Sequence, residues 1–173
     1  MKKRFWNTDK LMSFLAILLS VGTLLVFIYQ TNLIRKQQYA AVYPYLEMGF
    51  HGRGTKKMSF VLSNEGVGPA MIKSVEIKQK GEVYEGRFSG FLREIIDKDD
   101  ADSIQYLYSD IAEGKMLAVG AHLDLIDCQN AFTSDRMSEL LDEYSMELKI
   151  EYESIYGERW SIESGNKIPK KIK

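Results

Sequence analysis

The chain has 173 residues, 27% of them charged, and a formal net charge of −1 at pH 7. The charge is divided unevenly, because residues 37–173 hold 17 Lys or Arg against 23 Asp or Glu, a net charge of −6. An acidic domain lacks the basic face that binds phosphates, so we expect no nucleic-acid partner. The single cysteine excludes an internal disulfide.

Residues 11–34 carry no formal charge, and most of residues 11–29 are apolar. A helix over residues 11–29 would be about 28 Å long, close to the thickness of the hydrocarbon core of a bilayer. No polar stripe with a period of 3.6 residues marks a face that would meet water. A secretory signal peptide has a shorter apolar region and a cleavage site of small residues, which residues 30–36 lack. We therefore predict a head over residues 1–10 and an uncleaved transmembrane helix over residues 11–29.

Basic side chains are more numerous before this span than after it, with four in residues 1–10 and two in residues 30–36. Positive residues favour the cytoplasmic side of a membrane, so we expect the head in the cytoplasm and the domain outside. Within the span, Ala16, Ser20 and Thr23 are small residues about one helical turn apart. Small side chains let two membrane helices approach closely, so this pattern favours self-association.

Residues 30–41 contain good helix formers and no breaker, which predicts a helical stalk that ends before Pro44. Beyond the stalk, short segments of alternating polarity are separated by Gly, Asn and Pro, which is typical of strands. The alternation is clearest in residues 146–153. The predicted strands are residues 42–50, 58–63, 70–79, 104–108, 116–119, 122–128, 146–153 and 159–163.

Two segments have apolar residues at helical spacing instead. Residues 88–97 form one predicted helix, and residues 134–144 form a second, with Ser134 as its N-cap. Seven or eight short strands with two inserted helices predict a mainly β domain. We expect an antiparallel Ig-like β-sandwich over residues 42–166, followed by a basic tail over residues 167–173.

The glycines of Asn64-x-Gly66-x-Gly68-Pro69-Ala70 are typical of a phosphate-binding loop. Such a loop needs a helix after it, whereas a strand pattern follows here. We therefore interpret this motif as a glycine-shaped connection between strands.

An acidic cluster, Asp97, Asp99, Asp100 and Asp102, offers oxygen ligands for Ca²⁺. The EF-hand pattern fails, because Ala101 stands where the third ligand belongs and no glycine follows. We interpret the cluster as a solvated loop.

Cys128 ends an apolar strand segment, and we interpret it as a small buried hydrophobe. A catalytic thiol needs a histidine beside it, and the sequence places neither His51 nor His122 there. One cysteine and two histidines supply too few ligands for an ordinary structural zinc site. We predict no catalytic residue, no metal site and no cofactor.

Several motifs occur together in this chain: a Gln-rich stalk at residues 37–38, an extended Pro-containing segment at residues 42–46, the Asn-x-Gly-x-Gly-Pro-Ala motif within residues 63–70, and a Tyr…Tyr-Gly…Trp hairpin at residues 152–160. In these features the chain resembles a broad set of uncharacterised bacterial single-pass membrane proteins. The resemblance implies the fold and a place in the bacterial inner (plasma) membrane, with the domain in the periplasm or outside the cell. Its motifs are structural, so it implies no activity and no site residue.

Two functions fit these expectations. The first is a non-enzymatic interaction module or membrane-complex subunit, whose partners are the lipid bilayer and either another protein or further copies of the chain. The alternative is a membrane sensor or effector in stress or phage defence, whose domain binds a ligand and clusters the transmembrane helices. A surface hydrolase would need His51 or His122 to lie with carboxylates in a cleft.

Overall fold

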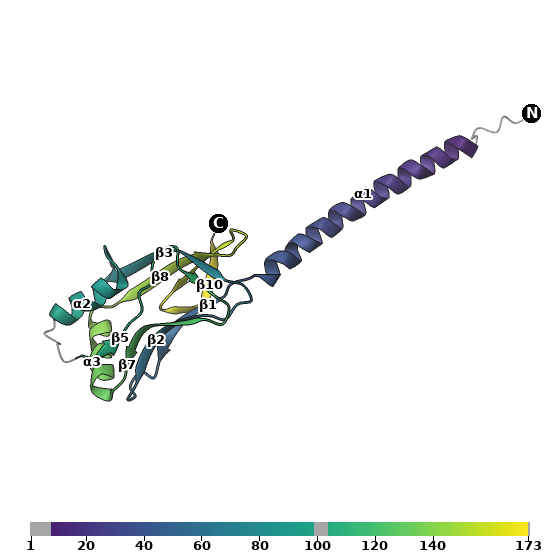
Figure 1. The fold of residues 1–173 in the computed structure, drawn as a ribbon. Helices are drawn as coiled ribbons and strands as arrows, with labels where there is room; N and C mark the ends of the chain where they lie inside the picture. The colour runs from purple at the N-terminus through teal and green to yellow at the C-terminus, as the bar shows by residue number, and fades with distance from the viewer. Residues whose placement is uncertain (1–7, 99–103, 173) are drawn as a thin grey trace, which may run out of the picture. The chain divides into compact units, whose positions relative to one another are not determined.

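A long apolar helix precedes the folded domain. The computed structural model describes residues 8–98 and 104–172, and the chain divides into two compact units, Met1–Ala41 and Val42–Lys173. The described part of the first unit is a single helix, α1 (Thr8–Ala41), which runs without interruption through the predicted span and stalk (Figure 1). Its 34 residues correspond to about 51 Å of helix. Within the described ranges it is the one helix long and apolar enough to cross a membrane.

Hydroxyl groups inside α1 bond to the helix itself. Ser13, Ser20 and Thr23 each donate a hydrogen bond of 2.8–2.9 Å to the carbonyl four residues earlier. These bonds satisfy the hydroxyls where a hydrocarbon phase would offer no partner.

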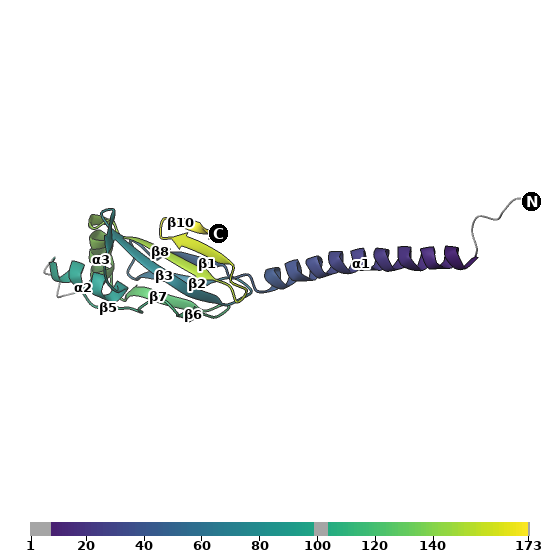
Figure 2. The same cartoon turned by 90° about the horizontal axis from the view of Figure 1, so that it is seen from above.

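The second unit contains two antiparallel sheets (Figures 1 and 2). One sheet has the order β1-β2-β7-β5, and the other has the order β10-β9-β8-β3-β4, with β6 pairing to the start of β3. The strands are β1 (Leu46–His51), β2 (Met58–Asn64), β3 (Ala70–Gln79), β4 (Glu82–Tyr84), β5 (Tyr106–Leu107), β6 (Met116–Leu117), β7 (His122–Cys128), β8 (Glu147–Glu153), β9 (Arg159–Glu163) and β10 (Asn166–Ile172).

This strand order is that of an immunoglobulin-like sandwich. β1-β2-β7-β5 matches the A-B-E-D sheet, and β9-β8-β3-β4 matches the G-F-C-C′ sheet. The two helices are insertions, α2 (Phe88–Lys98) between C′ and D and α3 (Ala131–Glu143) between E and F. The predicted Ig-like fold class is therefore confirmed, with β10 as an extra strand beside G.

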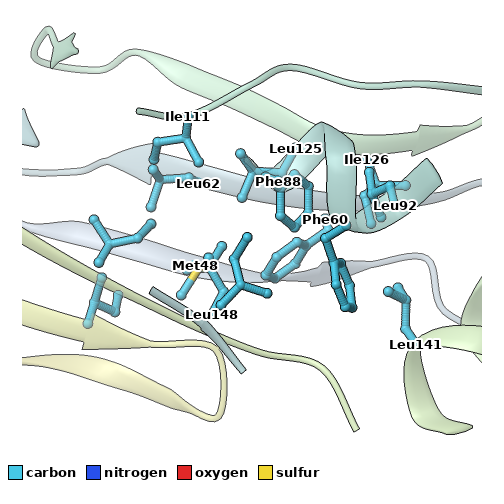
Figure 3. Close-up of a cluster of buried hydrophobic side chains, with 14 of the residues drawn as sticks. Met48, Phe60, Leu62, Phe88, Leu92, Ile111, Leu125, Ile126, Leu141 and Leu148 are labelled. Carbon is cyan, nitrogen blue, oxygen red and sulfur yellow. The ribbon is translucent and has the colours of Figure 1, made fainter. Parts of the chain in front are cut away.

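The hydrophobic core lies between the sheets, because strands of both sheets bury alternate residues. β2 buries Met58, Phe60 and Leu62, while Ser59 and Val61 between them are only partly covered. Figure 3 shows side chains from both sheets and both helices in this core, among them Met48, Phe60, Leu148, Phe88 and Leu141.

Helix α2 forms as predicted and extends one residue further. Its five apolar residues at helical spacing, from Phe88 to Ile96, are all buried. Asp110, from the segment before β6, accepts hydrogen bonds from the Ser89 amide (2.9 Å) and hydroxyl (2.8 Å). These bonds satisfy an amide of the first turn that no helical carbonyl can reach.

Helix α3 begins three residues earlier than predicted, so the assignment of Ser134 as its N-cap was wrong. The cap is Asn130, which has an extended backbone and accepts a 2.9 Å hydrogen bond from the Thr133 amide. Ser134 lies inside the helix, fully buried, and its hydroxyl accepts a bond from the Met58 amide. A tertiary contact therefore uses the hydroxyl that the local sequence pattern had assigned to capping.

Several strand boundaries also differ from prediction. β1 begins at Leu46 rather than at residue 42, because residues 43–45 bond to the β2–β3 loop instead of a strand. β5 and β6 are only two residues long, and β4 was not predicted. Asn166–Ile172, most of which the sequence analysis set apart as a basic tail, pairs with β9 as β10.

The strand directions divide the sandwich into two ends. We call the end where the chain leaves α1 the entry end, formed by residues 42–45, 64–71, 112–121, 154–159 and 170–172. We call the other end the far end, formed by α3 and by the turns at residues 52–57, 80–81, 144–146 and 164–165.

Candidate functional site

A pocket of about 420 Å³ opens at the far end of the sandwich. The β1–β2 turn and the end of α3 form one side, and the starts of β8 and of the β9–β10 turn form the other. Its apolar surface includes Phe50, Leu141 and Leu148, and its charged lining includes both signs. The charged residues are Arg53, Lys78, Asp142, Glu147, Lys149 and Glu163.

Arg53 joins the two elements on its side of the pocket. Its guanidinium lies over the Phe50 ring, 4.7 Å from the centroid, and one amino group is 2.7 Å from an Asp142 carboxylate oxygen. The same group donates a 3.3 Å hydrogen bond to the Ser138 carbonyl. The β1–β2 turn is thereby tied to the last turns of α3, although the ion pair is largely exposed.

The opposite side is a regular piece of sheet. Leu148 and Ser164 bond in both directions, with the Ser164 amide donating to the Leu148 carbonyl (2.8 Å) and the Leu148 amide donating to the Ser164 hydroxyl (3.1 Å). Lys149 is 3.0 Å from Glu151, and this hydrogen-bonded carboxylate raises the pKa of Lys149. Lys149 therefore stays positive throughout the physiological pH range.

The size and the lining of this pocket suit a small ligand. Its volume falls in the range of small-molecule sites, about 300–1,000 Å³. The described lining residues include no histidine or cysteine, and the one hydroxyl, on Ser164, already accepts a bond from the Leu148 amide. An apolar floor between cations and anions suits a small zwitterion or a short peptide segment that carries both charges.

Cys128 is fully buried at the end of β7, and burial raises the pKa of its thiol to about 11. The thiol is therefore neutral at physiological pH, and a neutral thiol is a poor nucleophile. His51 and His122 are exposed on the outer face of the same sheet. The structure does not bring Cys128 together with either histidine.

The two histidines share a shallow depression of about 310 Å³ with Glu47 and Glu65. The register keeps them apart, because His51 pairs with Ser59 and His122 pairs with Ser63. Four residues of β2 separate these partners by about 13 Å, too far for a direct proton transfer between the two histidines. Among residues 8–98 and 104–172, no group of three or more His, Cys, Asp or Glu is placed to hold a metal ion.

Of the acidic cluster, only Asp97 belongs to the described residues, where it is exposed near the end of α2. Asp99, Asp100 and Asp102 lie outside the described residues.

The motif that resembled a phosphate loop instead holds the entry of the chain into the domain. The Asn64 side chain is fully buried, and its amide group donates to the carbonyls of Gly68 (2.9 Å) and Leu117 (3.1 Å). Its carbonyl oxygen accepts from the amides of Tyr45 (3.3 Å) and Gly66 (3.1 Å). One side chain thus connects the entering segment, the β2–β3 loop and β6.

The two glycines of this motif allow direct backbone contact. A Cβ added at Gly68 would lie 1.9 Å from the Val42 carbonyl oxygen, and one at Gly66 would lie 2.3 Å from the Tyr45 nitrogen. We call Asn64, Gly66 and Gly68, with residues 42–45, the entry clasp. The sequence predicted a glycine-shaped connection between strands here, but it did not identify the segment that approaches the glycines.

Searches with the sequence and with the fold find no matching family model, no matching curated protein and no matching solved structure. The structure therefore supports the resemblance to bacterial single-pass membrane proteins in two features alone. These are the N-terminal apolar helix and the antiparallel β domain that follows it.

Proposed function

We propose that the protein is a non-enzymatic interaction module that one transmembrane helix anchors in a bacterial inner membrane. The observation that carries this proposal is the surface of α1, on which sixteen large apolar side chains are exposed and none is buried. Apolar surface of this extent is unfavourable in water and favourable in lipid. The domain, in contrast, has its own core and needs no cover from α1.

The anchor gives the domain its role. Attachment to the membrane confines the sandwich to two dimensions, which raises its effective concentration toward other membrane-bound proteins. The excess of basic residues before the span supports an orientation with the domain on the outer side of the membrane. The domain then binds a second protein or a further subunit of the same complex, and the far-end pocket offers a surface for such a contact.

Alkaline carbonate extraction of membranes tests the anchor. The full-length chain is expected to stay in the pellet, with an intact mass that includes α1. A variant with Leu18→Asp and Leu25→Asp is expected in the supernatant, whereas Lys56→Asp, in an exposed turn of the domain, serves as the matched control. Release of the unaltered protein, or a mature product that begins after Tyr29, would contradict the proposal.

The orientation and the partner need separate experiments. A reporter that is active only in the periplasm, fused after Lys173, is expected to be active. Cross-linking in intact cells before detergent extraction is expected to capture a second protein or a second copy through the domain. Recovery of the protein alone at every expression level would contradict a role in binding.

A second candidate function is a sensor whose ligand brings copies together, and two observations favour it. One is the far-end pocket, whose size and mixed charges suit a small zwitterion. The other is a groove along α1 around Gly22, lined also by Leu18, Leu19, Thr23 and Val26. A glycine in such a groove lets a second helix approach closely.

Membrane depolarisation distinguishes the sensor from the simple module. Overexpression is expected to depolarise cells, and Gly22→Leu, which fills the groove, is expected to abolish this effect. Ser20→Lys should abolish it as well, since it places a charge in the span. Val21→Leu is the control, because it places a leucine outside the groove. Equal depolarisation with Gly22→Leu and Val21→Leu would remove this candidate.

A further inference from the structure

Three separate loops of the entry end each present an exposed aliphatic side chain. Val67 lies in the β2–β3 loop, Val119 in the β6–β7 loop and Ile155 in the β8–β9 turn. They are 63%, 54% and 57% exposed, although each lies within a few residues of the core. Isolated exposed aliphatic residues are common, but one on each of three neighbouring loops at one end of a sandwich forms a surface.

Exposed apolar residues are concentrated at this end. In the described part of the domain eleven large apolar side chains are exposed, and six belong to the entry end although it contains only about a quarter of the residues. These six are Val67, Met71, Met116, Val119, Ile155 and Tyr156.

The loops are fixed with these side chains directed outward. The Val67 amide donates to the Tyr43 carbonyl (2.9 Å), and Gly120, next to Val119, donates to the Asn64 carbonyl (2.9 Å). In the β8–β9 turn the Ser154 amide donates to the Glu158 carbonyl (2.9 Å). The backbone at or beside each aliphatic residue is therefore held in place, which keeps these side chains at the surface.

The charge of the entry end differs from that of the domain as a whole. Its ranges contain four basic residues (Lys115, Arg159, Lys170 and Lys171) and three acidic residues. Residues 37–173 together carry a net charge of −6, so the acidic charge lies elsewhere. An anionic lipid surface would repel most of the domain but would not repel this end.

The chain also keeps this end near the membrane. The predicted span ends at residue 29, and residues 30–41 add about 18 Å of helix before Val42. The headgroup layer on each side of a bilayer is about 5–8 Å thick. The entry end therefore reaches the headgroups when the stalk lies tilted toward the membrane surface.

We propose that the entry end is a second membrane-contact surface, which places Val67, Val119 and Ile155 in the interfacial layer of the bilayer that α1 spans. Aliphatic residues flanked by basic ones are typical of surfaces that lie at the headgroup boundary. This contact rests on the proposed anchoring, and it fixes which face of the domain is turned toward lipid. The far-end pocket then faces away from the membrane, toward partners.

Site-directed spin labelling of the full-length protein in lipid vesicles tests this proposal. Single variants Val67→Cys, Val119→Cys and Ile155→Cys carry the label at the entry end, and Phe132→Cys, which is also an exposed apolar site but at the far end, is the matched control. Cys128 needs no substitution, because it is buried. Carbonate resistance of each sample is measured first, so that a failure of the anchor is distinguished from a failure of this contact.

The three entry-end labels are expected to lose collisions with a water-soluble relaxation agent and to gain them with oxygen, relative to the label at Phe132. Equal accessibility at all four sites in carbonate-resistant samples would overturn the proposal. Protection that disappears when each nanodisc holds a single copy would also overturn it, because a second copy would then be the cover. If the labels are protected in zwitterionic vesicles, the aliphatic residues are sufficient for the contact. If they are protected only in anionic vesicles, the contact also requires the basic residues.

A charge-insertion variant gives an independent measurement. Ile155→Asp changes an exposed residue, so the fold should be unaffected, and the label at Val119 is expected to regain access to the water-soluble agent. Phe132→Asp is the control and should leave that label protected. If Ile155→Asp leaves the protection at Val119 unchanged, the three loops do not act as one surface.

Discussion

The two ends of the sandwich are held together by different kinds of contact. At the entry end, a fully buried amide and direct backbone contacts join three segments in the entry clasp. At the far end, an exposed ion pair between Arg53 and Asp142 joins the β1–β2 turn to α3 beside an open pocket. Buried hydrogen bonds are costly to break because the freed groups find no water, whereas exposed ion pairs exchange readily with solvent. The domain therefore has one rigid end, where the anchor attaches, and one adjustable end.

The strongest test of this contrast is Gly68→Ala, for which we expect a loss of more than about 3 kcal/mol in the free energy of unfolding. The new Cβ would lie 1.9 Å from the Val42 carbonyl oxygen, and backbone atoms cannot move aside as a flexible side chain can. Urea titration of the full chain in detergent measures the effect. Gly49→Ala, where nothing lies within 4 Å of the added Cβ, should be nearly neutral. Similar stabilities for both variants would show that the clasp is loose.

Asn64→Ala should cost about 2–3 kcal/mol, since it leaves buried amides and carbonyls without partners. The affected groups belong to the entering segment and two loops, so hydrogen exchange at Tyr45 and Gly66 should accelerate more than exchange in α3. Asn166→Ala is the comparison at the far end, where the side chain makes one exposed bond to the Ile168 amide. We expect a change below about 0.5 kcal/mol for that variant.

The pH dependence of stability probes the packing of Cys128 near the far end. Its folded-state pKa is about 11, whereas the thiol of the unfolded chain ionises near pH 9. Above pH 9 the unfolded chain therefore holds fewer protons than the folded one, and stability falls as pH rises toward 11. The slope should approach, at most, about 1.4 kcal/mol per pH unit. The Cys128→Ala variant should lack this loss of stability between pH 9 and pH 11. In the unaltered protein at pH 8, a thiol reagent should modify Cys128 only as fast as the domain opens.

The smallest effect is expected for the ion pair on one side of the far-end pocket. A double-mutant cycle with Arg53→Ala and Asp142→Ala should give a coupling energy of about 0.5 kcal/mol, because both side chains are well exposed. High salt should reduce it further. A coupling above about 2 kcal/mol would mean that the far end is as firmly joined as the entry end, and the contrast between the two ends would fail.

Most of the fold could be read from patterns that are local in the chain. Strict alternation predicted β2 and β8, and helical spacing of five apolar residues predicted α2, because burial of one face is a local property of a strand or helix. Prediction was less accurate where a residue had two uses. Ser134 could cap a helix or bond to Met58, and only the packing of α3 on β2 decided between them.

The sequence by itself determined the apolar span, the strand-rich domain and the absence of a disulfide, since these follow from composition and short-range periodicity. The tertiary structure alone decided that Asn64, Gly66 and Gly68 hold the entering chain, that two distant histidines share one sheet face, and that exposed aliphatic residues gather at one end. The physical reason is that these arrangements join residues up to about a hundred positions apart. Their proximity is set by the pairing of β2 with β7 and of β3 with β8, which no local pattern specifies.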